Sequence, residues 1–296
     1  MNRVALLVPC HNAARFVPPF LAMVRAQSRP YDEVLFFDDG STDDTARLLL
    51  AAGCQVLRGE HNGGAAYARN RLLAATTADY VHLHDIDDEL DPAFVATLLP
   101  DVRPDGAVCC AFQRRRPDGH VEREDRFRDL PVAGPRVAYF IDHFLTFNAV
   151  IYPRAVLREL GGFEESLRIH EDLHLLLRVA ASGLPYVYHD RILTTWQLRG
   201  DSTYHAAESR HIAAGLLDCL ADLNRRWPRE IRRELGPTLL DLAWQFHAWR
   251  DTENTRRAAR LARGCGQWSI ANRGGRMRWL SRLFGPVGAY WLLAFR

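Results

Sequence analysis

The chain has 296 residues, of which 48% are hydrophobic and 25% are charged, and its formal net charge is +2. This composition is typical of a globular protein and excludes a disordered chain, and the balanced charge gives no general attraction to nucleic acid. All 38 basic residues are arginines. P-loop, Schiff-base and receiver-domain mechanisms are therefore excluded, because each needs a particular lysine.

The first hundred residues alternate between short apolar segments and segments of helical periodicity. Strands are predicted at residues 4–10, 33–38, 55–57 and 80–84, and helices at residues 16–27, 43–52, 65–77 and 91–99. This alternation predicts an α/β fold with a mostly parallel sheet and helices on both faces. Ligands of such sheets bind at the carboxyl ends of the strands, so the residues that follow the strands are the first candidates for a functional site.

The cysteines and the N-terminus bear on the cellular compartment. The six cysteines, at positions 10, 54, 109, 110, 219 and 265, form no C-x-x-C pair, so we expect neither a zinc site nor disulfides, and mostly buried, reduced thiols. The first predicted strand begins at Val4 with no basic and apolar leader before it. We therefore expect no secretory signal and a cytoplasmic protein.

Polar residues follow the first two predicted strands. Pro9, His11 and Asn12 come after the first strand, and Asp38 and Asp39 after the second. A carboxylate at this place can accept the imide N–H of uracil or bind ribose hydroxyls, which predicts a nucleotide pocket. The alternative is a tight turn and a helix cap.

The segment from Asn62 to Arg69 contains two glycines at the start of a predicted helix. Such glycines, beginning with Gly63, let backbone N–H groups approach a phosphate. Arg69 can contact a phosphate or a base carbonyl, although a lone arginine on a helix is more often a surface ion-pair partner. The chain has no G-x-G-x-x-G sequence, which argues against a dinucleotide-binding dehydrogenase.

Three carboxylates, Asp85, Asp87 and Asp88, follow the predicted strand at residues 80–84. Oxygen ligands at this spacing suit Mg²⁺ or Mn²⁺ carrying a diphosphate, such as that of a sugar nucleotide. The alternative is that these acids solvate a turn and cap the helix that begins near residue 91. His82 and His84 are interpreted as packing residues or as residues behind the metal ligands.

Four segments together resemble glycosyltransferase family 2 in order and spacing, over about residues 1–204. They are Val8-Pro9-Cys10-His11-Asn12, Asp38-Asp39-Gly40-Ser41-Thr42-Asp43, Asn62-Gly63-Gly64-Ala65-Ala66-Tyr67-Ala68-Arg69-Asn70 and Leu83-His84-Asp85-Ile86-Asp87-Asp88. The resemblance implies a GT-A fold, a mixed sheet flanked by helices, and inverting transfer from a nucleoside-diphosphate sugar with Mn²⁺ or Mg²⁺ at Asp85, Asp87 and Asp88. The nucleotide-binding residues that it implies are Pro9, His11, Asn12, Asp38, Asp39, Asn62, Gly63, Arg69, Asp85 and Ile86.

The second half of the chain carries further motifs of the same kind. Gly161-Gly162-Phe163 resembles the acceptor-side turn of the family, and Glu171-Asp172 resembles its E-D motif. By this resemblance Asp172, with Glu171 beside it, is the base that removes the proton of the acceptor hydroxyl. The alternative for the acidic pair is helix-dipole stabilisation of the helix that follows.

One motif departs from the family pattern. Trp196-Gln197-Leu198-Arg199 stands where the family often has Tyr-Arg-x-His, so Gln197 replaces the usual arginine and Arg199 the usual histidine. Arg199 is expected to bind phosphate oxygens directly. Trp196 is expected on the acceptor side, because aromatic faces pack against sugar rings, with burial in the core as the alternative.

The character of the chain changes near residue 205. We predict a catalytic domain at residues 1–204 and a helical region at residues 205–296. The segment 273–296 mixes arginines with apolar and aromatic residues but is too short and interrupted to span a bilayer. It is suited to peripheral contact with the inner face of the cell membrane, to packing on its own domain, or to a homodimer contact, and the sequence leaves these open.

The residues and the resemblance predict an inverting, metal-dependent glycosyltransferase. We expect it to move a sugar from a nucleotide-diphosphate donor, a UDP-sugar, to a hydroxyl of a glycan or lipid-linked acceptor in cell-surface polysaccharide synthesis. The first alternative is a GT-A-like binding or scaffold protein without turnover. The second, a sugar nucleotidyltransferase, is disfavoured because that class has a glycine-rich basic loop where this chain has Pro9 to Asn12.

Overall fold

The computed structural model describes residues 2–131, 136–199 and 209–266. The chain forms two compact units, of which the first comprises residues 1–136 and 143–206 and the second residues 137–142 and 207–296. Residues 200–208, around the predicted domain boundary, and the segment 273–296 lie outside the described residues.

The first unit is an α/β domain. Its strands are β1 (Val4–Cys10), β2 (Glu33–Asp39), β3 (Gln55–Gly59), β4 (Tyr80–Leu83), β5 (Glu89–Leu90), β6 (Ala107–Arg115), β7 (Val121–Asp125), β8 (Val150–Pro153) and β9 (Tyr186–Gln197). Its α-helices are α1 (Val17–Arg25), α2 (Thr45–Ala51), α3 (Ala65–Ala75), α4 (Phe94–Leu98), α6 (Arg154–Glu159) and α7 (Glu171–Ala181), with 3-10 turns η1 (Ala14–Phe16), η2 (Leu99–Asp101) and η3 (Phe147–Ala149).

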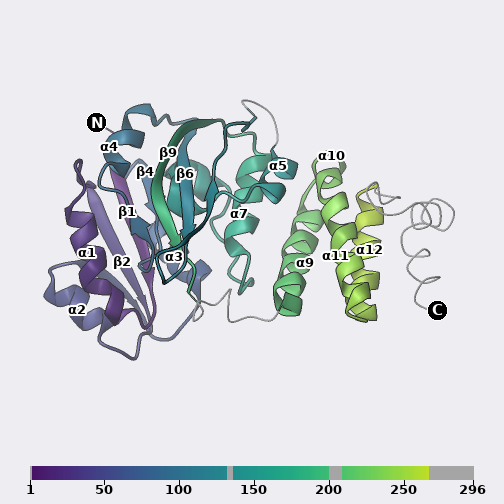
Figure 1. Ribbon diagram of the computed structural model, residues 1–296, viewed down its shortest axis with the longest axis horizontal. Coiled ribbons are helices and arrows are strands. Elements are labelled where there is room, and N and C mark those ends of the chain that lie inside the picture. Colours follow the sequence, from purple (N-terminus) through teal and green to yellow (C-terminus); the bar gives the residue numbers. More distant parts are fainter. Residues whose placement is uncertain (1, 132–135, 200–208, 267–296) are drawn as a thin grey trace. The chain divides into compact units, whose positions relative to one another are not determined.

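The described strands form one sheet in the order β3-β2-β1-β4-β8-β6-β9-β5, with β7 paired to β6. β1 pairs in parallel with both β2 and β4, and α3 packs on β1 and β2. A strand covered in this way needs apolar residues on both faces, and Val4 to Val8 are completely buried. In Figure 1, α1 and α2 lie to the left of this sheet and α7 to its right.

The other half of the sheet is mixed. β8 pairs antiparallel with β4 and β6, whereas β9 pairs in parallel with β6 and antiparallel with β5. The β5–β9 pair sets Glu89 opposite Thr195, which brings the end of β9 beside the segment that joins β4 to β5. The predicted mixed sheet with flanking helices is thereby confirmed.

The second unit is helical. It contains α5 (Val137–Asp142), α9 (Ser209–Arg226), α10 (Arg229–Arg232), η4 (Arg233–Leu235), α11 (Gly236–Ala248) and α12 (Thr252–Gly264). α11 packs against α9 and α12, and the Ala138 N–H donates a hydrogen bond of 2.9 Å to Glu234. The structure thus adds α5, from the middle of the chain, to the helices that the sequence predicts after residue 205.

Two expectations concern the whole chain. All six cysteines lie in the described ranges, where they are free thiols, and five of them are buried, as the sequence predicts for most of them. Within these ranges no helix has the length and apolar character needed to cross a membrane.

Candidate functional site

Residues 85–89, which follow β4 and end at the first residue of β5, form what we call the acidic loop. Its three aspartates have different surroundings. Asp88 is 7% exposed, accepts a hydrogen bond of 2.8 Å from the Gln197 N–H through Oδ1, and accepts another from Asn148 through Oδ2. Burial raises the pKa of the Asp88 carboxyl well above its ordinary value. Asp88 therefore fastens the acidic loop to β9, and both of its oxygens are engaged.

Arg69 joins the acidic loop to the start of α7. Its guanidinium donates one hydrogen bond of 2.8 Å to Asp85 Oδ1 and one of 2.9 Å to Glu171 Oε1. The arginine side chain is 11% exposed and lies over the Phe163 ring, 5.4 Å from its centroid. A buried guanidinium requires such partners, because an unpaired charge would be poorly solvated there. The predicted donor-side and acceptor-side residues are thus brought together by one side chain.

Glu171 and Asp172 occupy the first turn of α7, where the helix dipole favours negative charge. Nevertheless burial raises the pKa of both carboxyls above their ordinary values, while Arg69 acts in the opposite direction. Asp172 Oδ1 also accepts a hydrogen bond of 2.6 Å from the Leu173 N–H. A carboxylate with a raised pKa is a better proton acceptor than an ordinary one, which suits a general base.

The ends of β1 and β2 are joined by hydrogen bonds. The Asn12 N–H donates to Ser41 Oγ (2.9 Å), and Asn12 Oδ1 accepts from the Thr42 N–H (2.9 Å). His11 Nδ1 lies 2.8 Å from the Asp39 carbonyl oxygen. His11 and Asn12 are exposed, as is Asn62, and Pro9 is half-buried. These exposed groups are the predicted nucleotide-binding residues that solvent can reach at this edge.

Asp38 and Asp39 are placed differently from these neighbours, since they are 0% and 3% exposed. Asp39 accepts hydrogen bonds from the N–H groups of Gly63 (2.9 Å) and Gly64 (2.7 Å). The backbone donors that the sequence predicts for a phosphate are therefore paired with Asp39. Asp38 is paired with Arg58 at 3.2 Å. Both carboxylates are therefore buried, and they hold neighbouring residues of the site in place through these contacts.

Asn70 has a role that the sequence analysis missed. Its Oδ1 accepts from the Phe163 N–H (2.7 Å) and its Nδ2 donates to the Phe163 carbonyl (2.9 Å). Gly162 has φ +68°, and a Cβ there would lie 2.4 Å from Asn70 Oδ1. Asn70 thus fixes the Gly161–Phe163 turn, and the Phe163 ring of this turn contacts Arg69. The available signal was its position next to Arg69 in the same motif.

Trp196 lies at the end of β9, and Arg199 follows two residues after the strand. Arg199 donates to the Asp87 carbonyl oxygen (2.8 Å) and to the Asp87 carboxylate, and its guanidinium carbon lies 4.5 Å from the Phe16 ring centroid. The Trp196 ring lies 5.0 Å from the guanidinium carbon of Arg114. The arginine predicted to bind phosphate is therefore placed on the acidic loop.

A divalent metal would fit two carboxylates of this loop. Mg²⁺ and Mn²⁺ are bound in nucleotide sites by one or two carboxylates together with substrate phosphates. Asp85 and Asp87 have side chains 36% and 34% exposed and are separated by one residue. Asp88, predicted as a third ligand, has its oxygens directed to Asn148 and Gln197. In the described part of the chain, no group of three or more acidic, histidine or cysteine side chains is gathered for a metal.

The two histidines behind the loop are packing residues, as predicted. His82 contacts the Tyr31 hydroxyl (2.6 Å) and the Asn148 carbonyl (2.8 Å), and burial lowers its pKa well below the ordinary value. His84 Nδ1 lies 2.8 Å from the Asp85 carbonyl oxygen. Both rings therefore support the backbone around the acidic loop.

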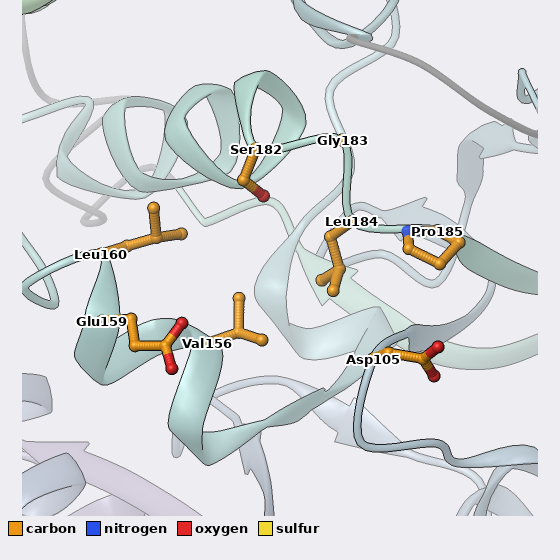
Figure 2. Close-up of a pocket in the computed structure, with 8 residues that line it drawn as sticks. All are labelled: Asp105, Val156, Glu159, Leu160, Ser182, Gly183, Leu184 and Pro185. Atoms are coloured by element: carbon orange, nitrogen blue, oxygen red, sulfur yellow. The ribbon is translucent and has the colours of Figure 1, made fainter.

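A cavity of about 340 Å³ lies elsewhere in the first unit. Figure 2 shows the Glu159 and Asp105 carboxylates on opposite sides of it, with Val156 and Leu184 between them. None of the predicted site residues lines this cavity, so it is separate from the candidate active site.

Two solved structures share the fold of this chain. S. aureus TarS, residues 1–349 with UDP-GlcNAc, has a TM-score of 0.71 at 15% identity, covering 99% of this chain and 90% of that one. The mannosyltransferase PcManGT from Pyrobaculum calidifontis, with GDP-Man and Mn²⁺, has a TM-score of 0.61 at 20% identity, covering 99% and 86%. These likenesses show the GT-A fold.

The sequence comparisons identify the family. The family model described as Glycosyl transferase family 2 matches residues 5–161, more than half of the chain. The chain belongs to this family, which confirms the resemblance that the sequence motifs indicate. Chondroitin synthase of Escherichia coli is 26% identical over 211 residues, covering 68% of this chain and 29% of that protein. The succinoglycan biosynthesis protein ExoU of Rhizobium meliloti is 29% identical over 203 residues, covering 62% and 58%. The chain thus spans less than two thirds of the length of these relatives.

Proposed function

We propose that this protein is an inverting, metal-dependent glycosyltransferase that moves a sugar from a UDP-sugar to a hydroxyl of a glycan or lipid-linked acceptor. One observation carries the proposal. Arg69 bridges Asp85 on the acidic loop and Glu171 beside Asp172. Groups suited to a metal–diphosphate and a group suited to general-base catalysis are therefore held in one site, as single displacement at an anomeric carbon requires.

The two carboxylate groups have separate roles in this proposal. Asp172 takes the proton of the acceptor hydroxyl as the hydroxyl oxygen attacks the anomeric carbon. Asp85 and Asp87 hold Mn²⁺ or Mg²⁺, which, when bound, offsets the charge that develops on the departing diphosphate. Arg69 keeps the acidic loop and the start of α7 in register, and Glu171 holds Arg69 from the other side.

The wider role follows from the relatives. Succinoglycan biosynthesis and chondroitin synthesis are named for two proteins similar to this chain, and TarS is described with UDP-GlcNAc. These names support a UDP-sugar donor and a role in polysaccharide synthesis. GDP-Man in PcManGT makes a GDP-sugar the rival donor.

Calorimetric titration tests this proposal. UDP, GDP, CDP and dTDP are each added to the purified protein with Mn²⁺ and again with EDTA. We expect UDP to bind with Mn²⁺ and to lose most of its affinity in EDTA. Binding of GDP alone would replace the donor, and binding of no nucleotide would favour the scaffold protein without turnover.

A further inference from the structure

The Arg199 side chain is built around one aspartate of the acidic loop. Its guanidinium donates to the Asp87 carbonyl oxygen at 2.8 Å and also to the Asp87 carboxylate. A single side chain thereby engages both the backbone and the side chain of one residue. This fork geometry is specific to arginine, and it aligns the positive charge with the Asp87 carboxylate.

Three further contacts hold this arrangement in place. The Phe16 ring lies 4.5 Å from the Arg199 guanidinium carbon. Gln197, two residues earlier, donates through its backbone N–H to Asp88 (2.8 Å) and through Nε2 to Glu89 (2.6 Å). The end of β9 is thus fixed to the acidic loop, and Arg199, two residues after the strand, lies against Asp87.

A second cation that approaches the Asp87 carboxylate beside Arg199 would be repelled by the charge of the guanidinium. A divalent metal within a few ångströms of a guanidinium is destabilised by like charge, and the repulsion grows where solvent is partly excluded. The side chains of Arg199 and Asp87 are 18% and 34% exposed. Solvent is therefore partly excluded from the Arg199–Asp87 pair, so the repulsion of a metal is significant. The pair is still exposed enough for Asp87 to exchange the arginine for another partner.

We propose that Arg199 is a built-in counter-cation of Asp87 and competes with the divalent metal for this carboxylate. The inference rests on the proposed function, because the release of Asp87 requires a donor diphosphate. A donor diphosphate offers oxygens to Arg199 and ligands to the metal at once, so it releases Asp87 from the arginine and makes metal and donor binding mutually dependent. Arg199 is then a positioning residue that couples the two ligands.

The test measures binding of Mn²⁺ alone, from the electron paramagnetic resonance signal of the free ion, to the full chain without nucleotide. Replacing Arg199 with alanine is expected to tighten Mn²⁺ binding about tenfold, the scale of one charge-assisted hydrogen-bonded pair. Arg199→Gln, which keeps a polar side chain, is expected to do the same. The gain should disappear when Asp87→Asn is added to Arg199→Ala.

The matched control is Arg115→Ala. Arg115 pairs with Glu89 on the same acidic loop at 2.7 Å, so its removal deletes one positive charge that contacts the loop at a residue other than Asp87. We expect less than a twofold change in Mn²⁺ affinity from this variant. An equal gain in both variants would reduce the effect to general electrostatics, and no gain in Arg199→Ala or Arg199→Gln would overturn the competition.

A second titration separates this inference from the proposed function. UDP is expected to raise the Mn²⁺ affinity of the wild-type protein more than that of Arg199→Ala, because only the wild type has an arginine to release. Failure of the wild-type protein to bind any nucleoside diphosphate would reject the proposed function. The result with Mn²⁺ alone would still decide whether Arg199 competes for Asp87.

Discussion

Two arginines contact the acidic loop, and they differ in what they hold together. Arg69 comes from within α3, is 11% exposed, and bridges Asp85 and Glu171 on two different elements. Arg199 lies two residues after β9, is 18% exposed, and engages Asp87 through both its carbonyl oxygen and its carboxylate. The comparison teaches that deeper burial and two acidic partners mark Arg69 as a fixed structural bridge, whereas we propose that the less buried Arg199 is an exchangeable counter-charge.

Replacing Asp172 with asparagine should have the largest effect, because it removes the proposed base, which lies beside Glu171 at one end of the Arg69 bridge. We expect the rate of sugar transfer to fall by about 10²–10⁴-fold, the usual contribution of a general base. Donor binding should be preserved, since the proposed metal ligands are on the acidic loop. Transfer assays with a UDP-sugar and calorimetry with UDP measure the two quantities.

The same variant should not destabilise the protein. The pKa of Asp172 is raised in the folded state, so the stabilising contribution of this carboxyl is present at low pH and is lost as the pH rises through the raised value. At neutral pH asparagine relieves this penalty, and the midpoint of thermal unfolding should stay or rise. Asp105→Asn, beside the separate cavity, is the control. Wild-type transfer by Asp172→Asn would refute its assignment as the base.

Replacing each arginine with methionine tests the comparison directly. Arg69→Met leaves Asp85 and Glu171 without their buried partner, and breaking a buried charge pair destabilises a protein by about 3 kcal/mol. Arg199→Met breaks a more exposed pair, for which about 1 kcal/mol is the upper range. Urea denaturation followed by circular dichroism measures both. Equal losses in the two variants would break the distinction between them.

Asp87→Ala should weaken the binding of UDP in Mn²⁺ by about tenfold, because it removes one of the two proposed carboxylate ligands and a partner of Arg199. In EDTA the same substitution should change UDP binding little. Glu89→Ala is the matched control, since Glu89 is on the same loop and pairs with Arg115 and Gln197 instead of Arg199. A loss of affinity as large in Glu89→Ala would show that the loop, and not the ligand, was disturbed.

The sequence predicted the fold better than it predicted the contacts within the candidate site. Apolar strands and ordered motifs were enough for the βα half of the sheet and for the acidic loop at its edge. Periodicity could not show that Asp39 takes the glycine N–H groups or that Asn70 fixes the Gly161–Phe163 turn. Those contacts join residues 25 and 93 positions apart, and pairing at such distances depends on the packed sheet.

The smallest expected difference between the two arginines is in how their replacement changes the pH dependence of sugar transfer. Burial raises the pKa of Asp172 above its ordinary value of 3.8, and Arg69 holds it lower than burial alone would. Because the base must be ionised, transfer should lose rate as the pH falls through this raised value, so the acid limb lies above pH 3.8. Arg69→Met should move that limb to still higher pH, whereas Arg199→Met, whose partner is Asp87, should leave it in place. The profile is measured with saturating donor and constant Mn²⁺, at pH values where circular dichroism shows each variant folded. A limb at the ordinary value, or one displaced equally by both substitutions, would mean that Arg69 has no special relation to the base.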